Sequence, residues 1–164
     1  AARNARVVRL LPASHLRAVG PPWSRTLNRH TVLIVDDNQD NRDIFATTLK
    51  SRGYAVRLAK NGAEGVRMAC EELPAAILMD IHMPVMNGIE ATVALKAQPA
   101  LAGVPVLAVS AYDVHEPELR QAGFCTFLPK PVAPAFLAHA VRVCIETAAK
   151  GASWIRVGPM EASP

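Results

Sequence analysis

Residues 31–37 read TVLIVDD, and residues 75–80 read AAILMD. Each stretch is a short apolar run that ends in a carboxylate. A continuous apolar run of this length is typical of a strand buried on both faces, as in a parallel sheet covered by helices. An acidic residue directly after so apolar a strand is costly to place unless it has a role. The two stretches therefore predict the kind of sheet and the edge at which its polar residues gather.

Five strands are predicted to alternate with five helices. The strands are expected at residues 32–35, 54–58, 75–79, 104–109 and 124–128. The helices are expected at residues 38–52, 61–72, 88–97, 116–122 and 133–149, where apolar residues recur with helical spacing. This alternation predicts an α/β fold with a doubly wound, parallel, five-stranded sheet. In such sheets the chemistry lies beyond the carboxyl ends of the strands.

The same spacing predicts which helix residues face the sheet. The inward residues are expected to be Ile44, Phe45, Thr48 and Leu49 in the first helix, Ala63, Val66 and Ala69 or Cys70 in the second, and Phe136, Leu137, Ala140, Val141, Cys144 and Ile145 in the last. The three cysteines, Cys70, Cys125 and Cys144, are predicted to fill the core. Because their number is odd and none forms a CxxC pair, a reduced, cytoplasmic protein is favoured.

Charge is distributed unevenly along the 164 residues. Residues 1–30 hold six of the 18 basic residues and none of the 14 acidic ones. We expect a basic, flexible N-terminal extension over residues 1–30, a domain over residues 31–149 and a C-terminal tail over residues 150–164. The domain itself is mildly acidic, so the net charge does not argue for direct DNA binding. In the tail, Trp154 and Ile155 are expected to pack on the domain or on a partner.

Polar residues follow four of the predicted strands. They are Asp36 and Asp37 after the first strand, Asp80 after the third, Ser110 after the fourth and Lys130 after the fifth. Three neighbouring carboxylates repel one another, and a hard divalent cation relieves that repulsion. We therefore predict a Mg²⁺ site formed by the three aspartates, with the backbone carbonyl of His82 as a further ligand.

This set of groups suits phosphoryl transfer. A carboxylate can attack phosphorus and form an aspartyl phosphate, while a cation and a short donor stabilise charge on the phosphoryl oxygens. Asp80, on the central strand, is the predicted phosphoacceptor, with Lys130 pairing with the phosphoryl group and Ser110 hydrogen-bonding it. His82 and Tyr112 either flank the path of attacking water and tune the lifetime of the phosphate, or are surface loop residues.

Four segments resemble the receiver domain of two-component response regulators: VDDN at 35–38, LMDIHMPVMNG at 78–88, VSA at 109–111 and LPKP at 128–131. The resemblance covers residues 31–149. It implies a flavodoxin-like (βα)5 fold with strand order 2-1-3-4-5 and a cis peptide bond before Pro131. It also implies that Asp80 accepts a phosphoryl group, with Mg²⁺, from a sensor histidine kinase or a histidine phosphotransfer protein. Phosphorylation would then switch a surface that binds a downstream protein target.

Two positions depart from the pattern of that family. A hydroxyl on the fourth strand and an aromatic residue on the fifth move together in the family, and Ser110 and Phe127 occupy those positions here. Phe127 has no phenol hydroxyl, so the switch must rest on packing. The segment from Ser110 to Lys130 is also about two residues shorter than usual. The resemblance therefore implies a short or displaced fourth helix.

Several alternatives stay open at this point. The chain could be a receiver fragment of a larger hybrid kinase or regulator, a scaffold that works without phosphate, or a homodimer. A phosphohydrolase of the haloacid dehalogenase type also uses an aspartate and Mg²⁺, but it needs a second acid where His82 stands. A Rossmann dinucleotide-binding domain is excluded, because no GxGxxG follows the first strand. We predict a signalling phosphoacceptor rather than an enzyme, with only self-catalysed phosphotransfer and slow autodephosphorylation.

Overall fold

A computed structural model describes residues 30–157, and the predicted extension before His30 and the last residues of the tail lie outside this range. Strands and helices alternate in the order β1 (Thr31–Val35), α1 (Gln39–Ser51), β2 (Ala55–Ala59), α2 (Gly62–Glu72), β3 (Ala76–Asp80), α3 (Gly88–Lys96), β4 (Val106–Ser110), α4 (Glu116–Ala122), β5 (Thr126–Pro129) and α5 (Pro134–Ala148). Every expected element is present, and most ends fall within a residue or two of the prediction.

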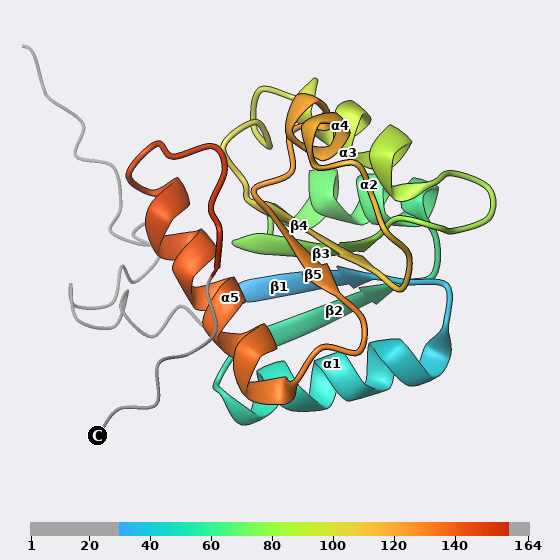
Figure 1. The fold of residues 1–164 in the computed structure, drawn as a ribbon, viewed down its shortest axis with the longest axis vertical. Coiled ribbons are helices and arrows are strands. Elements are labelled where there is room, and N and C mark those ends of the chain that lie inside the picture. The colour runs from blue at the N-terminus through green and yellow to red at the C-terminus, as the bar shows by residue number, and fades with distance from the viewer. Residues whose placement is uncertain (1–29, 158–164) are drawn as a thin grey trace, which may run out of the picture.

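The five strands form one parallel sheet in the order β2-β1-β3-β4-β5, which confirms the predicted topology. Helices α1 and α5 cover one face of the sheet, and α2, α3 and α4 cover the other (Figure 1). Because successive side chains of a strand point to opposite faces, β1 sends Leu33 and Val35 into one core and Val32 and Ile34 into the other. Among the described residues, no helix has the length and apolar character needed to cross a membrane.

The predicted inward face of α1 is wrong at one residue. Ile44 is 55% exposed, whereas Phe45, Ala46 and Leu49 are buried. Phe45 and Leu49 define the buried side of the helix, and helical spacing alone allows either Ile44 or Ala46 to be buried beside them. The smaller residue takes the buried position, and the larger one faces solvent.

The predicted inward face of α2 is wrong at Ala63, which is exposed, and of the alternatives Ala69 and Cys70 it is Ala69 that is buried. The buried residues of this helix are Gly62, Gly65, Met68 and Ala69. The glycines allow a close approach, because a Cβ atom on Gly65 would lie 2.8 Å from Cγ2 of Val35. The inward face of α2 thus contains residues that an apolar pattern does not detect. Of the three cysteines, only Cys125 and Cys144 fill the core as predicted.

Asparagine side chains begin the three helices that follow β1, β2 and β3. Asn38, Asn61 and Asn87 each accept a hydrogen bond from the backbone N–H three residues later. Helix α3 begins against the end of β3, where a Cβ atom on Gly88 would lie only 2.1 Å from the carbonyl oxygen of Asp80. This contact fixes the backbone at Asp80 and therefore the direction of its side chain.

Two expectations concern α4 and the segment that follows α5. Helix α4 is only seven residues long, so the short fourth helix implied by the resemblance is confirmed. Beyond α5, Trp154 and Ile155 pack on the domain itself, which decides between the two locations expected for them.

We expect Leu73→Asn to stabilise the fold. Leu73 ends α2 in the left-handed region, with φ 48° and ψ 67°, and its side chain is 55% exposed. A residue with an ordinary Cβ atom pays about 1 kcal/mol for this conformation, and asparagine tolerates it better. In urea unfolding, the free energy of unfolding should be higher for Leu73→Asn than for the wild type. Leu73→Ala should show no such increase. An equal gain in both variants would contradict this explanation.

Candidate functional site

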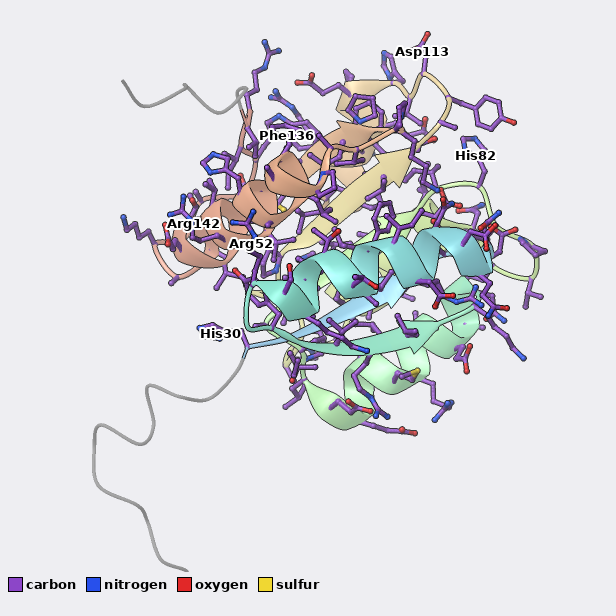
Figure 2. All side chains as sticks on the ribbon, turned by 90° about the horizontal axis from the view of Figure 1, so that it is seen from below. His30, Arg52, His82, Asp113, Phe136 and Arg142 are labelled. Atoms are coloured by element: carbon purple, nitrogen blue, oxygen red, sulfur yellow. The ribbon has the colours of Figure 1, made fainter. Side chains whose placement is uncertain are left out.

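The predicted polar residues come together where the strands of the sheet end. Asp36 follows β1, while Asp80, Ser110 and Lys130 lie at or just beyond the ends of β3, β4 and β5. Figure 2 shows His82 and Asp113 at this end of the molecule and Arg52 and Arg142 at the far end. The site therefore occupies the edge that the sequence predicted, and it joins residues from four strands.

Three carboxylates form the centre of the site. Oxygen atoms of Asp36, Asp37 and Asp80 all lie within 4.8 Å of one another. Asp36 and Asp80 are buried, whereas Asp37 is exposed. Close, hard oxygen donors of this kind suit Mg²⁺, which binds through one or two carboxylates and keeps several waters. The geometry of the three aspartates therefore fits a divalent cation, while the contribution of the His82 carbonyl stays a prediction.

Asn41 and Arg42, both on α1, hold the side chain of Asp36 and the backbone of Asp36 and Asp37, and both were missed from the sequence. The Asn41 amide donates to both oxygens of Asp36 at 3.2 Å, and the Asn38 backbone N–H donates to Oδ1 at 2.9 Å. The Arg42 guanidinium donates to the backbone carbonyls of Asp36 and Asp37 at 2.7 and 3.0 Å. The available signal was their place in the first turn of the helix that directly follows the carboxylates.

Lys130 supplies the positive charge of the site. Its Nζ atom lies 2.7 Å from Oδ2 of Asp36 and 3.3 Å from Oδ1 of Asp80. The Lys130 backbone N–H donates to the carbonyl of Ser110 at 2.8 Å, and the Lys130–Pro131 peptide bond is cis, as the resemblance implied. The ammonium group thus bridges two buried carboxylates that belong to different strands.

Asp80 is placed to act as a nucleophile. Burial raises the pKa of its carboxyl group, the Lys130 ammonium lowers it, and the Asp36 carboxylate raises it further. Its Oδ1 atom also accepts a hydrogen bond from the Ile81 backbone N–H at 3.0 Å. A carboxylate that is poorly solvated and held beside a cation retains reactivity toward phosphorus that full hydration would reduce.

Ser110 is buried and lies between two neighbours at the rim of the site. Its Oγ atom is 3.3 Å from Nδ1 of His82, and it accepts a hydrogen bond from the Tyr112 backbone N–H at 3.2 Å. The His82 and Tyr112 rings meet edge to face, with centroids 5.0 Å apart. Tyr112 is nevertheless exposed, and a role of the two rings at the site stays a prediction. Phe127 is half-buried against the core beside α2, α3 and α4, and its switch role stays a prediction.

Comparison with known proteins gave consistent matches. A family model described as the response regulator receiver domain matches residues 32–142. The polar-differentiation response regulator DivK of Brucella anthropi is 36% identical over 110 residues, which are 65% of this chain and 89% of that protein. Among solved structures, the Vibrio cholerae chemotaxis protein CheY4 is 30% identical with a TM-score of 0.67, covering 70% of this chain and 97% of its own.

A second solved structure bears on the metal. It is the receiver domain of the sensor histidine kinase PA1611 from Pseudomonas aeruginosa, with a magnesium ion coordinated in the active-site cleft. This domain is 34% identical with a TM-score of 0.67, over 71% of the present chain and 98% of its own.

We expect Lys130→Met to destabilise the fold by about 3 kcal/mol, because it leaves Asp36 and Asp80 buried without their cation. The double variant Asp36→Asn/Lys130→Met should recover part of this loss, since it removes one of the two stranded charges. Urea unfolding of both single variants and the double variant, in buffer with EDTA, measures the coupling. Strictly additive effects would contradict a direct interaction between Lys130 and Asp36.

We expect Asp80→Asn to stabilise the fold at neutral pH when divalent cations are chelated. The folded state raises the pKa of Asp80, so the wild type loses stability as the pH rises from the unfolded-state pKa, about 3.9, through the folded value. Asparagine avoids this loss because it stays neutral. The difference in the free energy of unfolding should shrink when the measurement is repeated below about pH 4. A gain that is independent of pH would have another cause.

Proposed function

The chain belongs to the response regulator receiver family of two-component signalling, and we propose that Asp80 is the residue on which it accepts the phosphoryl group. One observation carries this assignment. The Asp80 carboxylate is buried on the central strand, 3.3 Å from the Lys130 ammonium and beside the two other aspartates. Asp36 is also buried beside Lys130, but it follows β1 and not the central strand, and Asp37 is exposed. With Asp80 as the acceptor, Asp36 and Asp37 both remain free to hold a metal.

The proposed transfer uses the residues as they lie. An oxygen of Asp80 attacks phosphorus, a new P–O bond forms, and the bond between phosphorus and the donor breaks, so the electron pair leaves with the donor. Lys130, already in contact with Asp80, pairs with a phosphoryl oxygen, and the Ser110 hydroxyl donates to another. Asp36 and Asp37 would hold Mg²⁺, which supplies further positive charge to the phosphoryl group when bound.

The donor is proposed to be a phosphohistidine of a sensor histidine kinase or of a histidine phosphotransfer protein. This proposal is supported by the relatives, which include a polar-differentiation response regulator and the receiver domain of a sensor histidine kinase. The free thiols Cys70, Cys125 and Cys144 support a reduced, cytoplasmic location. The output is proposed to be a contact with a downstream protein target.

Two further properties follow from the rim of the site. Ser110 and Phe127 are proposed to report phosphorylation through packing, since Phe127 offers no hydroxyl for a hydrogen bond. Loss of the phosphate is proposed to be slow and self-catalysed, with His82 and Tyr112 controlling the approach of water. Their ring contact and their proximity to Ser110 support that role.

We expect the chain to gain the mass of one phosphoryl group when it is incubated with acetyl phosphate and Mg²⁺. Asp80→Asn should gain none, because it lacks the nucleophilic oxygen anion. Asp37→Asn should accept the group at least about tenfold more slowly, since it removes a metal ligand without touching the Asp80–Lys130 pair. Intact-mass spectrometry over a time course measures all three proteins.

The controls separate the remaining alternatives. Glu146→Gln, an exposed carboxylate on α5, should accept the phosphoryl group at the wild-type rate. If Asp80→Asn also gains mass, the acceptor lies elsewhere. If acetyl phosphate is consumed over many turnovers without an adduct, a phosphohydrolase is favoured. If no reaction occurs under trapping conditions, a scaffold that works without phosphate is favoured.

A further inference from the structure

Residues 152–157, which we name the strap, fold back over the β5 edge of the sheet. The Ile155 backbone N–H donates to the carbonyl of Cys125, just before β5, at 2.7 Å. Trp154 packs against the core beside α2, α3 and α4, while Ile155 and Val157 pack against the core beside α1 and α5. Figure 1 shows this red segment turning back beside α5. The strap therefore spans the border between the two layers of helices.

Two side-chain contacts tie the strap to α4. The Arg120 guanidinium lies over the Trp154 ring, with Cζ 4.8 Å from the ring centroid. Arg156 lies 3.4 Å from a carboxylate oxygen of Glu116, and Glu116 also pairs with Arg120. A cation over an indole ring and an ion pair each contribute modestly when exposed. Together they link the first and second turns of α4 to the strap.

Apart from the strap, α4 is held by its packing on α3 and by its buried side chains. It buries only Leu119 and Ala122, and His115 at its start makes no side-chain capping bond. A largely exposed loop of five residues separates its first residue from Ser110. The position of α4 is therefore set by its packing on α3 and the core and by the contacts of Glu116 and Arg120 with the strap.

Two features of the strap bear on its release from the domain. The Trp154 indole N–H is buried and finds no acceptor among the described residues. A cavity of about 400 Å³ lies under the beginning of the strap, lined by Ala152, Ser153, Arg120 and the buried thiols of Cys125 and Cys144. The cavity therefore leaves room for the beginning of the strap to change position.

We propose that the strap is an intramolecular cover for the surface of α4 and β5, and that its docking is coupled to phosphorylation through α4. The coupling to phosphorylation, unlike the cover itself, rests on the proposed function. Phosphorylation of Asp80 draws on Ser110, shifts the following loop and α4, and weakens the hold of Arg120 and Glu116 on the strap. The edge of β5 and the adjoining face of α4 then become available to the downstream protein. By linkage, loss of the strap must in turn favour the phosphorylated arrangement.

The first experiment tests the link between the strap and α4 without phosphate. Hydrogen exchange of the full chain should be about fivefold faster at the amides of α4 and at Tyr112 in Trp154→Leu/Arg156→Gln than in the wild type. Arg142→Gln, which removes a similar exposed ion pair on α5, should leave these amides unchanged. Arg156→Gln alone, which leaves the packing of Trp154 intact, should give a smaller change in the same amides. Unchanged exchange at α4 in both strap variants would overturn the proposal.

The second experiment tests the coupling. In a Trp23→Phe background, Trp154 is the remaining tryptophan, and its emission should shift to longer wavelength after acetyl phosphate and Mg²⁺ but not in Asp80→Asn. Intact mass is read from the same samples. An adduct without a shift overturns the coupling and leaves the proposed function standing. If no adduct forms, both the proposed function and the coupling are contradicted. The hydrogen-exchange experiment then decides by itself whether the strap covers α4.

Discussion

The arrangement of this domain depends on one ammonium group placed between two buried carboxylates. Lys130 contacts Asp36 and Asp80 at 2.7 and 3.3 Å, although 94 residues separate it from the first of them. Two carboxylates buried this close would otherwise repel each other and take up protons. Because their cation comes from beyond the last strand, the charge balance of the site exists only when β1, β3 and β5 are all in place. Folding and assembly of the site are therefore the same event.

Charge balance at the site also limits what it can bind. With Asp37 exposed beside the pair, the three carboxylates outnumber the Lys130 ammonium and the Arg42 guanidinium near them, so the site has an excess of negative charge that suits a divalent metal. An incoming phosphoryl group needs that metal and Lys130 together, since either one alone leaves like charges in contact. The chemistry at Asp80 is thus restricted by electrostatics before any partner is involved.

Sequence reasoning predicted the sheet and the site well because both depend on short, strong signals. Apolar strands that end in carboxylates located Asp36 and Asp80, and their strand order brought them together. The reasoning failed at Ile44 and Ala63, where small neighbouring residues that allow close approach took the buried positions. It also left Trp154 undecided, because the position of a tail depends on contacts such as the one with Arg120 that have no periodic signal.

The two edges of the sheet are protected in different ways. At one end, β2 is partly exposed, but it carries Arg57, which is paired with Glu72 at 2.7 Å, and charge on an edge strand discourages the addition of another strand. At the other end, β5 is only four residues long, ends in Pro129 and is adjoined by the strap. If the strap leaves as proposed, the carbonyl of Cys125 at the start of this edge becomes free to pair with another chain. A signal that releases the strap would allow a partner to bind at this edge, and it would also make the edge more prone to aggregation.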